Sequence, residues 1–109
     1  MRRALIVGIN HYPTDPLTAS VEDAKAIKAL LQRHEDGRPN FDCRLYLSEE
    51  KGPAITQPFL RKQLRRLFAN EADVVLFYFS GHGVQINTST HLATQDYDEG
   101  NEGISVTEL

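Results

Sequence analysis

The sequence contains little of what covalent cross-linking, membrane insertion or nucleic-acid binding requires. Its 109 residues include a single cysteine, Cys43, which excludes an internal disulfide framework and suits a reducing compartment. The net charge of −3 gives no reason to expect nucleic acid or an anionic membrane as a partner. No stretch approaches the ~20 apolar residues of a membrane span, and the apolar run at 4–9 is too short for a signal peptide. We therefore expect a cytoplasmic protein.

Motifs that bind nucleotides or metals are also missing. Neither Gly8 nor Gly81 belongs to a Gly-x-Gly-x-x-Gly or P-loop pattern, which argues against the common phosphate-binding loops. His11, His34 and His91 show no zinc spacing with one another or with the cysteine. The acidic residues near the C-terminus do not match the calcium loop of about twelve residues. Spacing alone predicts no cofactor.

The strongest positive signal is the segment 73–83, Asp-Val-Val-Leu-Phe-Tyr-Phe-Ser-Gly-His-Gly. The apolar residues after Asp73 show no polar alternation, which is typical of a strand buried on both faces of a parallel sheet. His82 then lies at the carboxyl end of this strand, where open α/β sheets place their chemistry. The two glycines let a substrate approach closely. A tight turn without function is the alternative interpretation of the same residues.

Two further strands are predicted before this segment. A continuous apolar run predicts a buried strand at 4–9, and alternating apolar and polar residues predict a half-exposed strand at 41–47. With the strand at 73–79, right-handed crossovers are expected, and the first strand is predicted to lie between the other two. Asn10, His11 and Tyr12 would then lie on the same rim as His82. The prediction is an α/β fold with a mostly parallel sheet.

Amphipathic helices are predicted near 18–34 and 57–70, because apolar residues recur there at spacings of three and four. Ser20 and Asp23 resemble a capping box at the start of the first helix. The second helix carries a basic cluster at 61–66, which we interpret as a solvated helix face. A polar loop is predicted at 48–53.

The sequence after His82 is polar and predicts loops, with one short candidate strand at 91–94. An acidic stretch follows that includes Asp96, Asp98 and Glu99. It admits three interpretations: a solvated loop, a site for a hard cation, or a pocket wall for a basic side chain. Residues 105–109 resemble the start of a helix. Because the chain stops inside that start, we expect it to be a fragment of one domain.

His82 is the only histidine whose context suggests catalysis, since an imidazole can take a proton from a nucleophile and return it to a leaving group. Ser80 lacks the strand-turn-helix elbow of a nucleophilic serine, so a turn hydrogen bond is the expected role. Cys43 is expected about 10 Å to the side of the His82 strand and roughly 10 Å or more away along it. Cys43 is therefore predicted not to reach His82.

Four blocks of sequence occur in a recognisable order. They are Ala-Leu-Ile-Val-Gly-Ile-Asn-x-Tyr at 4–12, Glu-Asp-Ala at 22–24, Tyr-Phe-Ser-Gly-His-Gly at 78–83, and Leu-Ala-Thr-x-Asp at 92–96 with Gly-Ile-Ser-Val-x-Glu-Leu behind it. In this order they resemble the caspase-like cysteine peptidases, and the metacaspase and bacterial caspase-homologue branch in particular. The third block is fairly specific, and the others add weight by their order.

The resemblance implies a three-layer caspase-like (flavodoxin-like) sandwich that is incomplete at the C-terminus. Residues 1–109 would be the N-terminal part of one catalytic domain, which contains the histidine of the catalytic dyad but not the cysteine. His82 would be the catalytic base and acid, and the Gly83 amide would help to bind the oxyanion. The nucleophilic cysteine would come from the next strand, outside this chain, and form a thioester acyl-enzyme. The fragment alone is then expected to be inactive.

The resemblance also implies a polypeptide substrate. Metacaspase-like members cut after Arg or Lys, and the acidic stretch makes Asp96 and Asp98 candidates for holding that basic side chain. Some members need calcium, which the spacing does not support here. Two other functions stay open from the sequence: a non-catalytic caspase-like module for interaction or regulation, and a flavodoxin-like domain that binds a phosphate or nucleotide.

Overall fold

A parallel sheet forms the centre of the molecule. The computed structural model describes residues 1–48, 54–69, 71–98 and 101–109. Its strands β1 (Arg2–Gly8), β2 (Asp42–Leu47) and β3 (Val74–Ser80) are parallel and lie in the order β2-β1-β3. The predicted sheet, with the first strand in the middle, is confirmed. The predicted loop at 49–53, the helix end at Asn70 and the acidic Glu99 lie outside the described residues.

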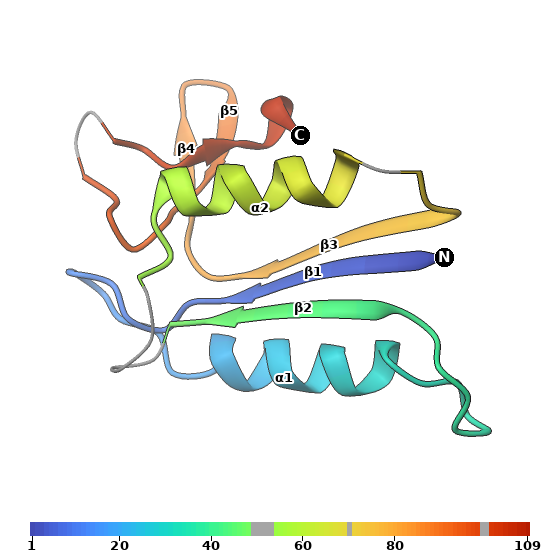
Figure 1. Ribbon diagram of the computed structural model, residues 1–109. Helices are drawn as coiled ribbons and strands as arrows, with labels where there is room; N and C mark the ends of the chain where they lie inside the picture. The colour runs from blue at the N-terminus through green and yellow to red at the C-terminus, as the bar shows by residue number, and fades with distance from the viewer. Residues whose placement is uncertain (49–53, 70, 99–100) are drawn as a thin grey trace.

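The helices α1 (Ser20–Leu31) and α2 (Gln57–Ala69) cover opposite faces of this sheet (Figure 1). Alternate residues of β1 point to the two faces, as the pleat of a strand requires. Leu5 and Val7 pack in the cluster that contains Leu60 and Leu64 of α2. Ala4 and Ile6 point to the other face, where they form a second cluster with Ala24 of α1. From Ala4 onwards both faces of β1 are therefore buried, which explains the continuous apolar run that begins there.

The first turn of α1 is capped from a distance. The capping box predicted for Ser20 and Asp23 is wrong, because Ala19 precedes the helix and makes no capping hydrogen bond through its side chain. Instead Asn10 Oδ1 accepts hydrogen bonds from the backbone N–H groups of Ser20 at 2.9 Å and Val21 at 3.2 Å. These groups have no partner within a helix. The loop after β1 thus ties the start of α1 to the end of the sheet.

A small antiparallel sheet follows His82, where the sequence predicted mainly loops. It contains β4 (Gly83–Ile86), β5 (Ser89–Leu92) and β6 (Ile104–Ser105) in the order β4-β5-β6. The strand predicted at 91–94 overlaps only the end of β5. The hairpin between β4 and β5 turns at Asn87, whose φ of 55° is the left-handed conformation that such turns favour.

The predicted helix at 105–109 was only partly right. Ser105 ends β6, and the residues behind it form a single 3₁₀ turn, η1 (Val106–Glu108). The Ser105 hydroxyl does accept a hydrogen bond from the Thr107 N–H at 3.3 Å, as a capping serine would. Neither described α-helix has the length and apolar character that a membrane span would need.

Candidate active site

His82 lies where the two sheets meet, two residues beyond the end of β3 and one before β4. The carbonyl oxygen of His82 accepts a hydrogen bond from the Ala93 N–H at 2.9 Å. Its own N–H donates to the Tyr12 hydroxyl, also at 2.9 Å. The backbone of His82 is thus held from both sides, by the small sheet and by the loop after β1. The expected location at the carboxyl edge of the parallel sheet is confirmed.

Tyr12 is the residue that connects these parts. Its hydroxyl donates to the Ala93 carbonyl oxygen at 2.8 Å while it accepts from His82. Its ring packs against the imidazole of His82, with ring centroids 4.6 Å apart and planes tilted by 53°. Burial raises the pKa of Tyr12 to about 12, against the smaller opposing effect of the His82 N–H. The phenol therefore stays protonated near neutral pH and can both donate and accept.

The imidazole of His82 is oriented by a backbone carbonyl group. Its Nε2 atom lies 2.5 Å from the carbonyl oxygen of Asp15. Because a carbonyl oxygen only accepts, Nε2 carries the hydrogen, and Nδ1 of the neutral ring is left as the proton acceptor. Asp15 has a φ of 51°, an uncommon value that aspartate tolerates better than most residues. The loop after β1 thus fixes the tautomer of the neutral ring.

The two glycines beside His82 differ in their surroundings. A Cβ atom on Gly81 would collide with the Tyr12 hydroxyl and press on the Phe79 ring. Gly83 is exposed, and a Cβ there would meet only the His91 carbonyl oxygen, at 4.0 Å. The Ala93 N–H donates to the His82 carbonyl oxygen, so these two residues face each other as a hydrogen-bonded pair. In an antiparallel ladder such pairs alternate with pairs that are not hydrogen-bonded, and Gly83 with Leu92 is the next pair. The Gly83 N–H therefore points away from β5. That N–H therefore faces the outer edge of β4.

A cavity of about 180 Å³ opens beside the imidazole. Its walls come from the loop after β1, from the start of the hairpin and from the segment after β5, and they include Asp15, His82, Gly83, Val84 and Tyr97. His82 and Gly83, which were predicted as site residues, therefore lie on one cavity. Asp96 and Asp98 are not among its lining residues.

Asp96 supports the start of α2. Its Oδ1 atom accepts from the Gln57 N–H at 3.0 Å and from the Thr94 hydroxyl at 2.5 Å, and its Oδ2 atom accepts from Asn101 Nδ2 at 2.9 Å. Burial opposes ionisation of Asp96, but these hydrogen bonds outweigh it and hold the pKa below its usual range. A carboxylate at a helix N-terminus also suits the helix dipole.

Asp98 lies in a tight turn, where it exchanges backbone hydrogen bonds of 2.9 Å with Asn101 in both directions. Its side chain is exposed. The binding of a basic substrate side chain by Asp96 and Asp98 stays a prediction.

Cys43 and Ser80 were the other residues weighed from the sequence as nucleophiles. Cys43 pairs with Ala4 in the amino-terminal half of the sheet and packs on the α1 face. Burial raises the pKa of its thiol, which makes it less reactive at neutral pH. Ser80 ends β3, and its carbonyl oxygen accepts from the Ile9 N–H at 2.9 Å. Among the described residues, no three His, Cys, Asp or Glu side chains are grouped closely enough to hold a metal ion.

Three residues of the site were not assigned a role from the sequence. Tyr12 was expected on the correct rim, but nothing indicated its hydrogen bonds to two other segments. Tyr97 was hidden within the acidic stretch. Asp15 acts through its carbonyl oxygen, a group that every residue has, so no side-chain pattern could identify it.

Comparison with known proteins gives consistent matches. A family model described as the caspase domain matches residues 1–106. Metacaspase-2 of Trypanosoma brucei brucei is 33% identical over 90 residues, which cover 76% of this chain and 25% of that protein. Metacaspase-1 of Botryotinia fuckeliana is 28% identical over 104 residues, which cover 90% of this chain and 24% of that protein. The chain thus spans about a quarter of the length of these relatives. No solved structure matches significantly.

Proposed function

The chain belongs to the caspase-domain family, and on that premise we propose that it supplies the histidine half of a cysteine endopeptidase site. The observation that carries the proposal is the orientation of His82. Its Nε2 atom is fixed on the Asp15 carbonyl oxygen, so Nδ1 is free to accept a proton from a thiol. A base held in one tautomer by a third group is the arrangement that nucleophilic catalysis requires.

The proposed reaction begins with transfer of a thiol proton to His82 Nδ1. The thiolate attacks the peptide carbonyl carbon, and negative charge develops on the carbonyl oxygen. The Gly83 N–H, which faces away from β5, would stabilise this charge by a few kcal/mol. His82 then returns the proton to the amine of the leaving peptide, and a thioester remains. Water hydrolyses the thioester with His82 as the base.

The thiol is proposed to come from the rest of the domain. Within the described part of the chain, β3 pairs with β1 alone, so its other edge is open. Val74 and Val75 near the start of β3 are 41% and 38% exposed. A further parallel strand along this edge would cover these apolar side chains and end close to His82. The place of Cys43 in the amino-terminal half of the sheet supports a nucleophile from elsewhere.

We propose an unstructured peptide with Arg or Lys before the cut as the substrate. The support is the family resemblance together with the acidic residues near the cavity. Asp96 would attract the basic side chain of the substrate through its negative charge and would not bind it directly, because its oxygens already accept three hydrogen bonds. We also propose that the chemistry needs no cofactor, so that activity should persist in a chelator such as EDTA.

The alternative is a non-catalytic caspase-like module for interaction or regulation. It would have no need of a histidine fixed in one tautomer beside an open cavity, and these features favour the peptidase. The two functions differ in whether the full-length protein carries a cysteine on the strand next to β3. They also differ in whether that protein turns over peptides.

The test uses the full-length protein and paired peptides that differ only in Arg, Lys or Asp before the cut. His82→Ala should reduce kcat by about 10²–10⁴-fold, the usual effect of losing a positioned base. His11→Ala is the matched control, because His11 is exposed on the same rim and does not line the cavity. Cys43→Ala should also leave activity unchanged. Full activity of His82→Ala would refute the catalytic role, whereas preference for Asp would refute only the basic-residue specificity.

A further inference from the structure

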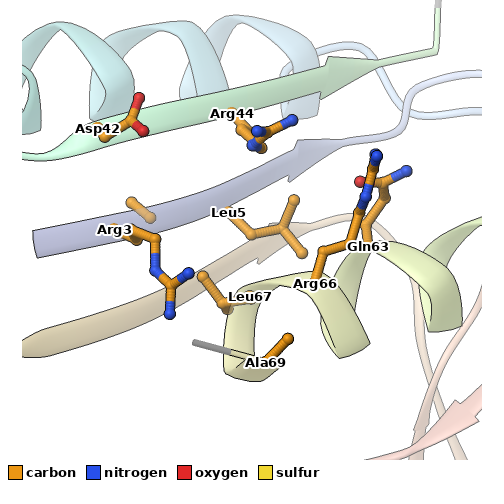
Figure 2. Close-up of a pocket in the computed structure, with 9 residues that line it drawn as sticks. Arg3, Leu5, Asp42, Arg44, Gln63, Arg66, Leu67 and Ala69 are labelled. Carbon is orange, nitrogen blue, oxygen red and sulfur yellow. The ribbon is translucent and has the colours of Figure 1, made fainter. Parts of the chain in front are cut away.

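A second cavity, of about 190 Å³, lies between α2 and the amino-terminal half of the sheet (Figure 2). Three arginines from three different elements line it: Arg3 on β1, Arg44 on β2 and Arg66 on α2. His82 lies beyond the opposite ends of the strands, so this cavity is separate from the candidate active site. The basic cluster expected from the sequence at 61–66 was interpreted as a solvated face, but it contributes Arg66 to this cavity.

Strand geometry explains why these side chains meet. Alternation along β2 turns Arg44 and Tyr46 to the same face, and the Tyr46 hydroxyl donates to Oε1 of Gln63 on α2 at 3.1 Å. Arg66 follows Gln63 by three residues and therefore lies on the same side of the helix. Figure 2 shows the Arg66 side chain extending from α2 towards β2, where Arg44 stands.

The charges in this cavity are not balanced. Arg3 is the register partner of Asp42, whose carboxylate also lines the cavity and offsets one positive charge. Within the described residues, Arg44 and Arg66 form no ion pair. Two guanidinium groups that face one cavity repel each other, and an anion between them would remove that repulsion.

Gln63 adds a neutral donor to the cavity. Its side chain is buried, at 5% exposure, and its Oε1 atom is already occupied by Tyr46. The group that Gln63 can offer to a ligand is therefore its amide N–H₂. Two guanidinium groups and one amide form a set that contains only donors, which suits an oxyanion and not a cation.

We propose that this cavity binds a phosphate group between Arg44 and Arg66, with the Gln63 amide as a third donor. Guanidinium groups match the geometry of phosphate oxygens and form strong charge-assisted hydrogen bonds with them. A phosphate near neutral pH carries close to two negative charges, which balances two arginines, whereas a carboxylate would balance only one. The group is either free inorganic phosphate or the phosphate of a modified side chain.

The experiment is calorimetric titration of the full-length protein with inorganic phosphate and, separately, with a short phosphoserine peptide. Arg44→Gln and Arg66→Gln should each weaken binding at least tenfold, equivalent to about 1.4 kcal/mol. Arg65→Gln is the matched control, since it removes the same charge from an exposed neighbour on α2 that does not line this cavity. It should change affinity less than about twofold at moderate salt, where long-range charge effects are screened.

Tighter binding of inorganic phosphate would identify the free ion as the ligand, and tighter binding of the peptide would identify a phosphorylated side chain. Both results support the proposed site if Arg44 and Arg66 are required. Absence of saturable binding by both probes would overturn the proposal, as would equal weakening by Arg65→Gln. Arg44 and Arg66 are exposed, so the variants should fold. Matching thermal unfolding curves would verify this.

Discussion

Replacing Tyr12 by phenylalanine tests whether this residue holds the candidate site together. The change removes one hydroxyl group and keeps the ring that packs on His82. Two hydrogen bonds are lost, from the His82 N–H at 2.9 Å and to the Ala93 carbonyl oxygen at 2.8 Å. Each hydrogen bond contributes about 1 kcal/mol net to stability. The loss is larger if the His82 N–H or the Ala93 carbonyl oxygen stays buried with no water to replace the hydroxyl. We expect the free energy of unfolding to fall by about 2–3 kcal/mol.

The measurement is urea unfolding of the full-length protein, with Tyr78→Phe as the control. Tyr78 packs on the α1 side of the sheet, and within the described residues its hydroxyl makes no hydrogen bond that the change would remove. The control should therefore stay within about 0.5 kcal/mol of the wild type, as is usual for changes that remove no buried contact. A loss at Tyr12→Phe no larger than that at Tyr78→Phe would refute the reasoning.

Alkaline pH gives a second measurement on the same pair of proteins. The pKa of Tyr12 is raised from 10.0 to about 12 in the folded state, so the folded protein keeps a proton that the unfolded chain loses. The stabilising contribution of the protonated phenol is complete below about pH 10 and is lost as the pH rises towards 12. Wild-type stability should decline through this window more steeply than that of Tyr12→Phe. Parallel curves would show that the Tyr12 hydroxyl is not buried as described.

Two further variants test other parts of the site. Asn10→Ala removes the acceptor for the first N–H groups of α1 and should lower stability by about 1 kcal/mol in urea unfolding, as loss of an N-cap does; an unchanged midpoint would contradict it. The pKa of Asp96 is lowered, so its stabilising contribution is present above the ordinary pKa of 3.8 and lost as the pH falls through the folded value. Asp96→Asn should therefore flatten the acid limb of the stability curve, and an unaltered limb would argue that Asp96 does not cap α2.

The parallel sheet could be predicted because its strands are long and strongly patterned. Both faces of β1 are covered by helices, so its sequence is apolar after the two arginines at its start. β3 is apolar up to Ser80, but it lies at the edge of the described sheet and its residues are exposed or half-buried, so the predicted burial on both faces is not seen there. The small sheet after His82 gave no such signal. Its strands have two to four residues and are partly exposed, so polar side chains are tolerated along them. Its stability comes from neighbouring segments, such as the Ala93 N–H on the His82 carbonyl oxygen.

Capping and tautomer selection were not predictable for a related reason. The sequence offered Ser20 as the local cap for α1, but the acceptor is Asn10, which precedes the helix by ten positions. Rules for capping assume a partner within the first turn, and a loop that returns to the helix lies outside them. The same loop places the Asp15 carbonyl oxygen on the imidazole, a contact that depends on the backbone path and not on the side chain.

The Gly-His-Gly motif combines two different requirements in three residues. At Gly81 the requirement is internal, because a side chain would displace the Tyr12 hydroxyl that holds His82. At Gly83 the chain itself leaves room for a Cβ atom, so its own packing does not demand glycine. A ligand oxygen must come within about 3 Å of an N–H group to form a hydrogen bond. On the proposed function, the absence of a side chain at Gly83 would keep that approach open for a substrate oxygen at the edge of β4, so the second glycine would serve binding and not packing.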